Sequence, residues 1–303
     1  MNPHRLRAYI YLAIVAAIWG IAGPVIKLTL RGLPPDIFLL YRLFISANCS
    51  LIIFIFTGIK FPREAKLTRD LFIYGFLNST ATLGLLFWGT DKTSLLDMSL
   101  ISLFGPILFI LAGFIFLKEH ITAKEKGGII IAFIGSALLI IEPLLRGNNG
   151  SGQLWGNVLI FASLLSGTIS GVYVKKLMRR DISPVLLANL SFIIGFITLA
   201  PFVIFKHGFL ASLAVITSAS LPYHLGVWYM AIFSGTIAYI LNNLGQKTIE
   251  LSEAALFAYL YPIFSAVLAI FLLGDKLTLP AIIGAVVIII GVFIAELKNK
   301  RIA

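Results

Sequence analysis

The sequence contains 303 residues, of which 59% are hydrophobic and only 12% are charged, and its mean hydropathy is +0.99. A water-soluble core of this size does not need so much apolar side chain, so the composition excludes an ordinary soluble domain and indicates a membrane protein. The net charge of +11 would also suit a nucleic-acid-binding protein, and the positions of the basic residues decide between the two.

Ten apolar stretches approach the length of about 20 residues that a helix needs to cross a bilayer. They are predicted at Leu6 to Leu30, Pro35 to Thr57, Leu71 to Thr90, Met98 to Leu117, Gly127 to Ile141, Leu154 to Val174, Pro184 to Phe205, Tyr223 to Gln246, Ala254 to Leu273 and Leu279 to Glu296. The first resembles a signal peptide but is too long and has no small-residue cleavage site, so we interpret it as a span. The fifth is the shortest, and Glu142-Pro143 is expected to end it.

The basic residues are distributed unevenly between the two sets of loops that these spans create. Only six lie in loops on the side opposite the N-terminus, namely Lys27, Arg31, Lys92, Arg146, Lys206 and Lys276. The others, apart from Arg42 inside the second span, share the side of the N-terminus. Cytoplasmic loops retain positive charge, so both termini are predicted to be cytoplasmic, in a multi-pass protein of the plasma (inner) membrane. The charge then reflects orientation and lipid headgroups, and no nucleic-acid partner is expected.

An internal repeat appears when the chain is shifted by 156 residues onto itself. The shift aligns Pro106 with Pro262, Thr122 with Thr278, and Gly89, Gly128 and Gly135 with Gly245, Gly284 and Gly291. A weaker match aligns Gly23 and Lys27 with Gly171 and Lys175. Each half contains five spans, an odd number, so the halves must insert with opposite orientation, as in secondary transporters. The predicted fold is therefore an all-α membrane protein of ten transmembrane helices, with one five-helix repeat at 1–146, a linker at 147–152 and an inverted repeat at 153–303.

Several short motifs occur along the chain, and those around Pro106 are repeated around Pro262. They are Trp19-Gly20, Lys27, Arg42, Thr93-Ser94-Leu95, Pro106 and Lys118 through Thr122 with Gly128 in the first half, and Glu253-Ala254-Ala255, Tyr261-Pro262 and Gly274 through Thr278 with Gly284 in the second. With these motifs the chain resembles the drug/metabolite transporter superfamily in its two-copy EamA-domain form. The resemblance implies a ten-helix transporter with a central cavity, often an exporter of amino acids or related metabolites. Asp97 departs from the small residue that such proteins usually carry there.

Polar side chains inside the spans mark the interior of the bundle, because they are costly in lipid. Ser163, Ser166, Ser170 and Tyr173 share one helix face, Tyr239, Asn242, Asn243 and Gln246 share another, and Asn78, Ser79 and Thr82 lie near the middle of the third span. Hydrogen bonds that hold helices together are the alternative interpretation of these stripes. The predicted substrate-binding residues are Trp19, Arg42, Asn78, Ser102, Ser166, Ser170, Tyr239, Asn243 and Tyr259. Pro106 and Pro262 are predicted mid-span hinges, with static kinks as the alternative.

Arg42 lies about 10 Å below the predicted outer end of its helix. It either extends to the surface or binds a substrate carboxylate or phosphate, or pairs with Asp97 or Asp91 across a gate. Lys27 has the same interpretations, with extension to the surface favoured. Every acidic residue falls in a loop or at a span end, so no obvious proton or sodium carrier is present. No metal site and no cofactor are expected, because the single cysteine and the four histidines are scattered.

These features favour a secondary transporter that exports or exchanges amino acids or related zwitterionic or anionic compounds by alternating access. Its partners would be the small-molecule substrate and the lipid bilayer, and a monomer would suffice. An intramembrane enzyme is the first alternative, but no nucleophile and base set, aspartate pair or zinc-binding motif occurs within the spans. A channel or scaffold is the second alternative, and it would not require inverted repeats.

Overall fold

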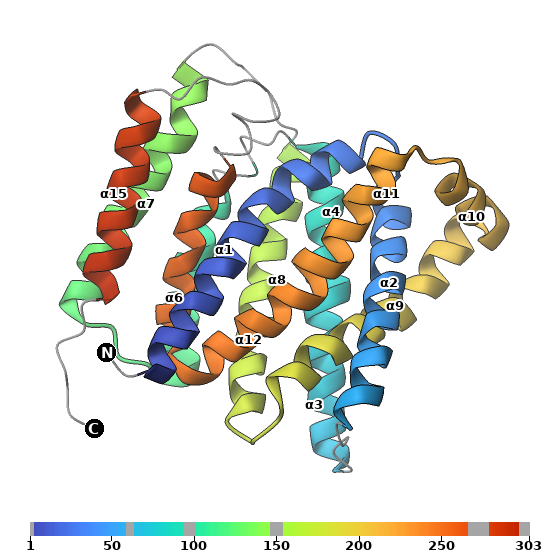
Figure 1. The fold of residues 1–303 in the computed structure, drawn as a ribbon, viewed down its shortest axis with the longest axis horizontal. Helices are drawn as coiled ribbons and strands as arrows, with labels where there is room; N and C mark the ends of the chain where they lie inside the picture. The colour runs from blue at the N-terminus through green and yellow to red at the C-terminus, as the bar shows by residue number, and fades with distance from the viewer. Residues whose placement is uncertain are drawn as a thin grey trace.

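The computed structural model describes residues 3–58, 64–93, 98, 101–145, 154–265 and 279–296, and every regular element in these ranges is helical (Figure 1). The α-helices are α1 (Pro3–Thr29), α2 (Pro35–Thr57), α3 (Ala65–Gly75), α4 (Leu83–Lys92), α6 (Phe104–Leu117), α7 (Ala123–Leu145), α8 (Leu154–Met178), α9 (Pro184–His207), α10 (Phe209–Ser218), α11 (Leu221–Trp228), α12 (Ala238–Thr248), α13 (Leu251–Ala255) and α15 (Leu279–Glu296). The π-helical segments η1 (Phe76–Thr82) and η2 (Tyr229–Ile237) join α3 to α4 and α11 to α12, and the 3-10 segment η3 (Leu256–Leu260) follows α13.

Six helices in the described ranges are long and apolar enough to cross a membrane. They are Pro3–Thr29, Pro35–Thr57, Ala65–Lys92, Leu154–Met178, Pro184–His207 and Leu221–Thr248, and shorter apolar helices occur at Phe104–Leu117, Phe209–Ser218 and Ile282–Ala295. Large apolar side chains such as Ile55, Phe56 and Phe205 stand exposed on the outside of the bundle, where lipid would cover them. The chain is therefore a helical membrane protein, and the arrangement of ten spans in two inverted repeats stays a prediction.

Helix ends follow the local sequence, with two departures from expectation. Pro35 begins α2, where its missing N–H is not needed, and Gly58 ends it in the left-handed conformation at φ 59°. The fifth span was expected to end at Glu142-Pro143, but α7 continues to Leu145, because a proline near a helix end removes only one hydrogen bond. The helix α10 was not expected. Gly208, at φ 80°, breaks the chain after α9 and lets this short apolar helix turn away.

The helices α7 and α15 lie side by side at one edge of the bundle (Figure 1). A Cβ atom on Gly128 would lie 2.5 Å from the Gly291 carbonyl oxygen, and one on Gly135 would lie 2.7 Å from the Ile288 amide nitrogen. As the residue number increases along α7 from 128 to 135, the number of the contacted residue in α15 decreases from 291 to 288. The two helices are therefore antiparallel. Only glycine allows backbones to approach this closely.

The two π-helical segments are stabilised in the same manner. A widened turn leaves a carbonyl without its usual helical partner. In η1 the Leu77 carbonyl accepts hydrogen bonds from the hydroxyls of Thr82 at 2.7 Å and Ser166 at 3.2 Å. In η2 the Ala231 carbonyl accepts from Thr236 at 3.3 Å and from Ser46 of α2 at 3.0 Å. Each wide turn is thus fixed by a threonine five residues later and by a serine from a neighbouring helix.

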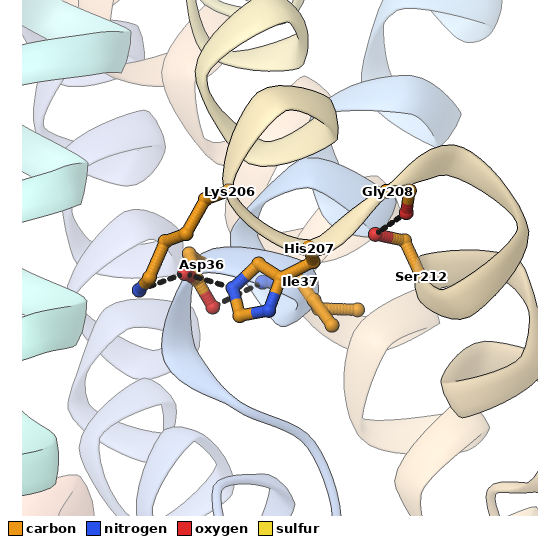
Figure 2. Close-up of polar contacts among 6 residues, drawn as sticks. All are labelled: Asp36, Ile37, Lys206, His207, Gly208 and Ser212. Atoms are coloured by element: carbon orange, nitrogen blue, oxygen red, sulfur yellow. Dashed lines mark hydrogen bonds and ion pairs between the residues drawn. The ribbon is translucent and has the colours of Figure 1, made fainter.

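Opposite ends of the bundle are tied by different polar clusters. At one end Asp36, in the first turn of α2, lies 2.7 Å from both Lys206 Nζ and His207 Nε2 of α9 (Figure 2). Its other oxygen accepts a hydrogen bond from the Ile37 amide at 3.0 Å. This buried carboxylate is therefore fully engaged in joining α2 to α9. At the other end Arg5 of α1 forms an ion pair with Glu253 of α13.

A central chamber as the candidate functional site

A chamber of about 400 Å³ lies in the middle of the bundle. The helices α1, α4, α6, α8, α12 and α13 and the segments η1, η2 and η3 form its walls. Residues just before α6 and just after η3 also contribute. The helix α2 contributes Arg42, and no described residue of α7, α9 or α15 reaches the wall. A volume of this size suits a small metabolite.

Most residues that the sequence singled out as substrate contacts meet in this chamber. The wall includes Trp19, Arg42, Asn78, Ser102, Ser170, Tyr239, Asn243 and Tyr259, together with Pro106 and Pro262. Ser166 is the exception, since its hydroxyl donates to the Leu77 carbonyl and accepts from Thr82 at 3.0 Å. The serines on this face of α8 therefore have two structural roles. Ser163 and Ser170 line the chamber, whereas Ser166 fixes the wide turn of η1.

Sequence reasoning did not find several wall residues. Met98, Phe109, Ser234 and Ser265 also line the chamber. Ser234 lies in η2, where π-helical turns change the period of the side chains, so no regular stripe marks it. Apolar wall residues carry no signal that separates them from ordinary core residues.

The strongest electrostatic feature of the chamber is Arg42. Arg42 is only 2% exposed, yet it forms part of the chamber wall. No carboxylate in the described part of the chain lies within ion-pair distance of it, and its Nε atom has no hydrogen-bond partner. Its nearest support is the ring of Phe87, whose centroid lies 5.5 Å from Cζ. Arg42 does not extend to the surface, and its expected partner Asp97 lies outside the described residues.

An aromatic cluster forms a second wall of the chamber. The ring of Trp19 packs edge to face on Tyr239, with centroids 5.1 Å apart, and on Tyr261 at 6.2 Å. The indole N–H donates to the Ser234 carbonyl at 2.9 Å, which fixes the ring and joins α1 to η2. The chamber thus offers both a cation and aromatic ring surface.

Both prolines lie within one turn after an interruption of the regular α-helix, and their predicted role as hinges, with static kinks as the alternative, stays a prediction. Pro106 is in the first turn of α6, and Pro262 is in the first turn of the helical stretch that follows η3. A proline needs no N–H at this position, so neither residue breaks a helix. Both still line the chamber where one helical segment ends and another begins.

Extension to the surface was the favoured interpretation of Lys27; the residue is half-buried, and its tip is bound to the protein. Its ammonium group donates hydrogen bonds to the carbonyls of Thr90 and Thr93, each at 2.7 Å. Both acceptors lie at the C-terminal end of α4, where backbone carbonyls have no helical partner. Lys27 therefore joins α1 to α4 and is absent from the chamber wall.

Acidic side chains are buried in several places, but none of those in the described ranges lines the chamber. Glu119 accepts hydrogen bonds from the amides of Leu251 at 2.8 Å and Ser252 at 2.9 Å. Glu125 accepts from the Thr122 amide at 2.6 Å in a helix-capping arrangement. The described residues contain no group of acidic, histidine or cysteine side chains that could hold a metal ion.

Known proteins are similar to this chain in sequence and in fold. The model of the EamA-like transporter family matches residues 6–141 and again residues 154–297. An uncharacterized transporter of Bacillus subtilis, YyaM, is 28% identical over 297 residues, which cover 96% of this chain and 94% of the relative. A probable amino-acid metabolite efflux pump of Escherichia coli is 26% identical, with 93% and 92% covered. A solved crystal structure at 14% identity has a TM-score of 0.74 over 98% of this chain and 97% of that one, and it supports the fold alone.

Proposed function

This chain belongs to the EamA-like transporter family, and we propose that it exports or exchanges amino acids or related zwitterionic and anionic compounds through the central chamber by alternating access. The family match confirms the resemblance that the motifs indicated. The names of its relatives describe transporters, which are not enzymes. The E. coli relative is named for amino-acid metabolites, and this name supports the proposed substrate class without deciding it.

The observation that carries the proposal is the buried guanidinium of Arg42 in the chamber wall, which forms no ion pair with any carboxylate of the described residues. A buried cation without a counterion is costly. A substrate carboxylate that binds there would remove this cost and form charge-assisted, bidentate hydrogen bonds. The amides of Asn78 and Asn243 and the rings of Trp19 and Tyr239 would contact the rest of the molecule.

The inverted-repeat arrangement belongs to the same proposal. The aligned glycines Gly128 and Gly284 lie in α7 and α15, and these two helices pack antiparallel. Equivalent spans that run in opposite directions are what inversion requires. Two inverted halves around one chamber provide two similar routes to it, one from each side of the membrane. We also propose that the protein lies in the inner membrane with both termini in the cytoplasm.

Ligand-dependent thermal stability of the purified protein tests the assignment of Arg42. Amino acids and simple carboxylates should raise the melting temperature of the wild type, whereas the corresponding amino-acid amides should not, because they lack the carboxylate. In Arg42→Gln this stabilisation should fall by the equivalent of about 1.5–3 kcal/mol of binding free energy.

Arg31→Gln, at an exposed arginine between α1 and α2, is the matched control and should behave as the wild type. Equal stabilisation by carboxylates and amides, or an Arg42→Gln variant that still distinguishes them, would contradict the assignment.

A further inference from the structure

Lys27 has a counterpart in the second half of the chain. Lys175 of α8 is buried, and its ammonium group donates hydrogen bonds to the carbonyls of Gln246 and Ile249. These acceptors lie at the C-terminal end of α12, just as Thr90 and Thr93 lie at the end of α4. Each lysine thus reaches from one helix to the last carbonyls of another.

The internal repeat relates the residues of the two contacts, with one shift for the lysines and another for the acceptors. One alignment of the halves superposes Lys27 on Lys175, and the separate shift of 156 residues superposes Thr90 on Gln246 and Thr93 on Ile249. In both halves the lysine contacts the pair of carbonyls at these matching positions. The acceptors are backbone atoms, so their side chains are free to differ.

The backbone at both helix ends has the same conformation. Thr93 leaves α4 at φ −123° and ψ 167°, and Ile249 leaves α12 at φ −121° and ψ 168°. Neither helix ends with a left-handed glycine that would satisfy its last carbonyls. The ammonium group supplies the missing donors and places a cation where the helix dipole favours one.

The two contacts lie at opposite ends of the bundle. The Thr93 hydroxyl contacts Asn157 in the first turn of α8, whereas Lys175 lies 18 residues further along the same helix, or about 27 Å at 1.5 Å per residue. The chamber lies between them, and neither lysine is part of its wall. Lys27 joins α1 to α4, Lys175 joins α8 to α12, and all four of these helices line the chamber. Each contact therefore ties two walls together at one end.

The connection between α12 and α13, residues 249–250, is here called the elbow. It shows how the end of the chamber near Lys175 is stabilised. Lys175 binds the carbonyls that end α12, and Glu119 accepts from the Leu251 and Ser252 amides that begin α13. Leu251, Ala254 and Ala255 on the chain after this elbow line the chamber. A shift of the elbow would therefore change the chamber wall directly. Asp275, which the repeat aligns with Glu119, lies outside the described residues.

We propose that Lys27 and Lys175 are the two gate residues of the transport cycle. Each closes one end of the chamber by binding the terminal carbonyls of α4 or α12, and each releases them when that end opens. The acceptors within hydrogen-bond distance are neutral carbonyls, which water can replace when the end opens. This proposal rests on the transport function proposed above, but it does not depend on which substrate is carried.

Thiol labelling from each side of the membrane, without any substrate, tests the gates. In a Cys49→Ser background, Ala258→Cys places a single thiol in the chamber wall. A membrane-impermeant maleimide is applied to intact cells and, separately, to inside-out vesicles. Lys27→Met should open the Lys27 end, so labelling from that side should rise by about tenfold and labelling from the other side should fall. Lys175→Met should produce the opposite pair of changes.

The controls are Lys92→Met and Lys247→Met, because these exposed lysines lie at the ends of the same two helices, α4 and α12. Both should label as the parent does. If a methionine variant does not fold, the corresponding Lys→Gln variant keeps one neutral donor and should shift labelling in the same direction by a smaller factor. Unchanged labelling, or a change of the same sign on both sides in both variants, would overturn the proposal. If labelling shifts as expected while no carboxylate stabilises the protein, the gates stand and the substrate proposal falls.

Discussion

Trp19 illustrates how one residue can be recognised from sequence and yet explained only by structure. Its depth in the first span indicated an interior role, because interfacial tryptophans lie near membrane faces. The sequence could not show that its ring packs on Tyr239 and Tyr261, or that its N–H binds the Ser234 carbonyl. For Ser166 and Lys27, the sequence did not predict the structural role. Their partners are backbone carbonyls, which leave no trace in the residue types of a sequence.

The aromatic wall should select for the apolar part of a substrate. Removing the ring in Trp19→Ala should raise KM by about 3- to 10-fold for amino acids with large apolar side chains, and less for small ones, because aromatic contacts contribute about 0.5–1.5 kcal/mol. Transport kinetics in proteoliposomes would measure this difference. Trp155→Ala, at an exposed tryptophan of α8, should leave the preference unchanged. An equal rise in KM for large and small substrates would show that Trp19 does not contact the side chain.

At the scale of helices, apolar length and proline positions predicted the start of α2, α8, α9 and α15 correctly. The π-helical segments and α10 were not predictable in this way. A π-helical turn depends on partners from other helices, such as Ser46 for η2 and Ser166 for η1, and α10 depends on the positive φ of Gly208. Repeated glycines indicated the internal repeat, but the sequence did not show that Gly128 and Gly135 of α7 pack against α15.

The contact between α7 and α15 should tolerate almost no added volume. In Gly128→Ala the new Cβ would lie 2.5 Å from two backbone atoms of α15, so the helices must separate, at a cost of about 1–3 kcal/mol. Gly127→Ala is the matched control, because nothing lies within 4 Å of a Cβ at that position. Thermal unfolding followed by size-exclusion chromatography should show a lower midpoint for Gly128→Ala alone. Equal midpoints for the two variants would mean that this contact is looser than described.

For the whole molecule, the loop charges make a prediction about orientation. The contacts of Arg180 with Asp70 at 3.3 Å and of Arg5 with Glu253 join segments that the charge bias assigns to one side of the membrane. In a Cys49→Ser background, a cysteine at Arg63 or Arg180 should react with an impermeant reagent only after the cells are permeabilised. A cysteine at Arg31 should react in intact cells. Labelling of the Arg180 site in intact cells would reverse the proposed topology.

The energy source of transport is also a property of the whole molecule. The chamber wall in the described ranges contains hydroxyls, amides, aromatic rings and Arg42, but no acid that could carry a proton across. We therefore expect movement down the gradient of the substrate, or exchange of one substrate molecule for another.

Counterflow of a labelled amino acid into proteoliposomes preloaded with the unlabelled compound tests this account most directly. The assay is run with equal pH on both sides and with an imposed proton gradient. We expect uptake to require the internal amino acid, to fall to background in Arg42→Gln and to change less than about twofold with the gradient, since no carboxylate or histidine lines the described chamber wall. Absence of counterflow for every amino acid and carboxylate tested, or uptake driven several-fold by the proton gradient alone, would contradict the account.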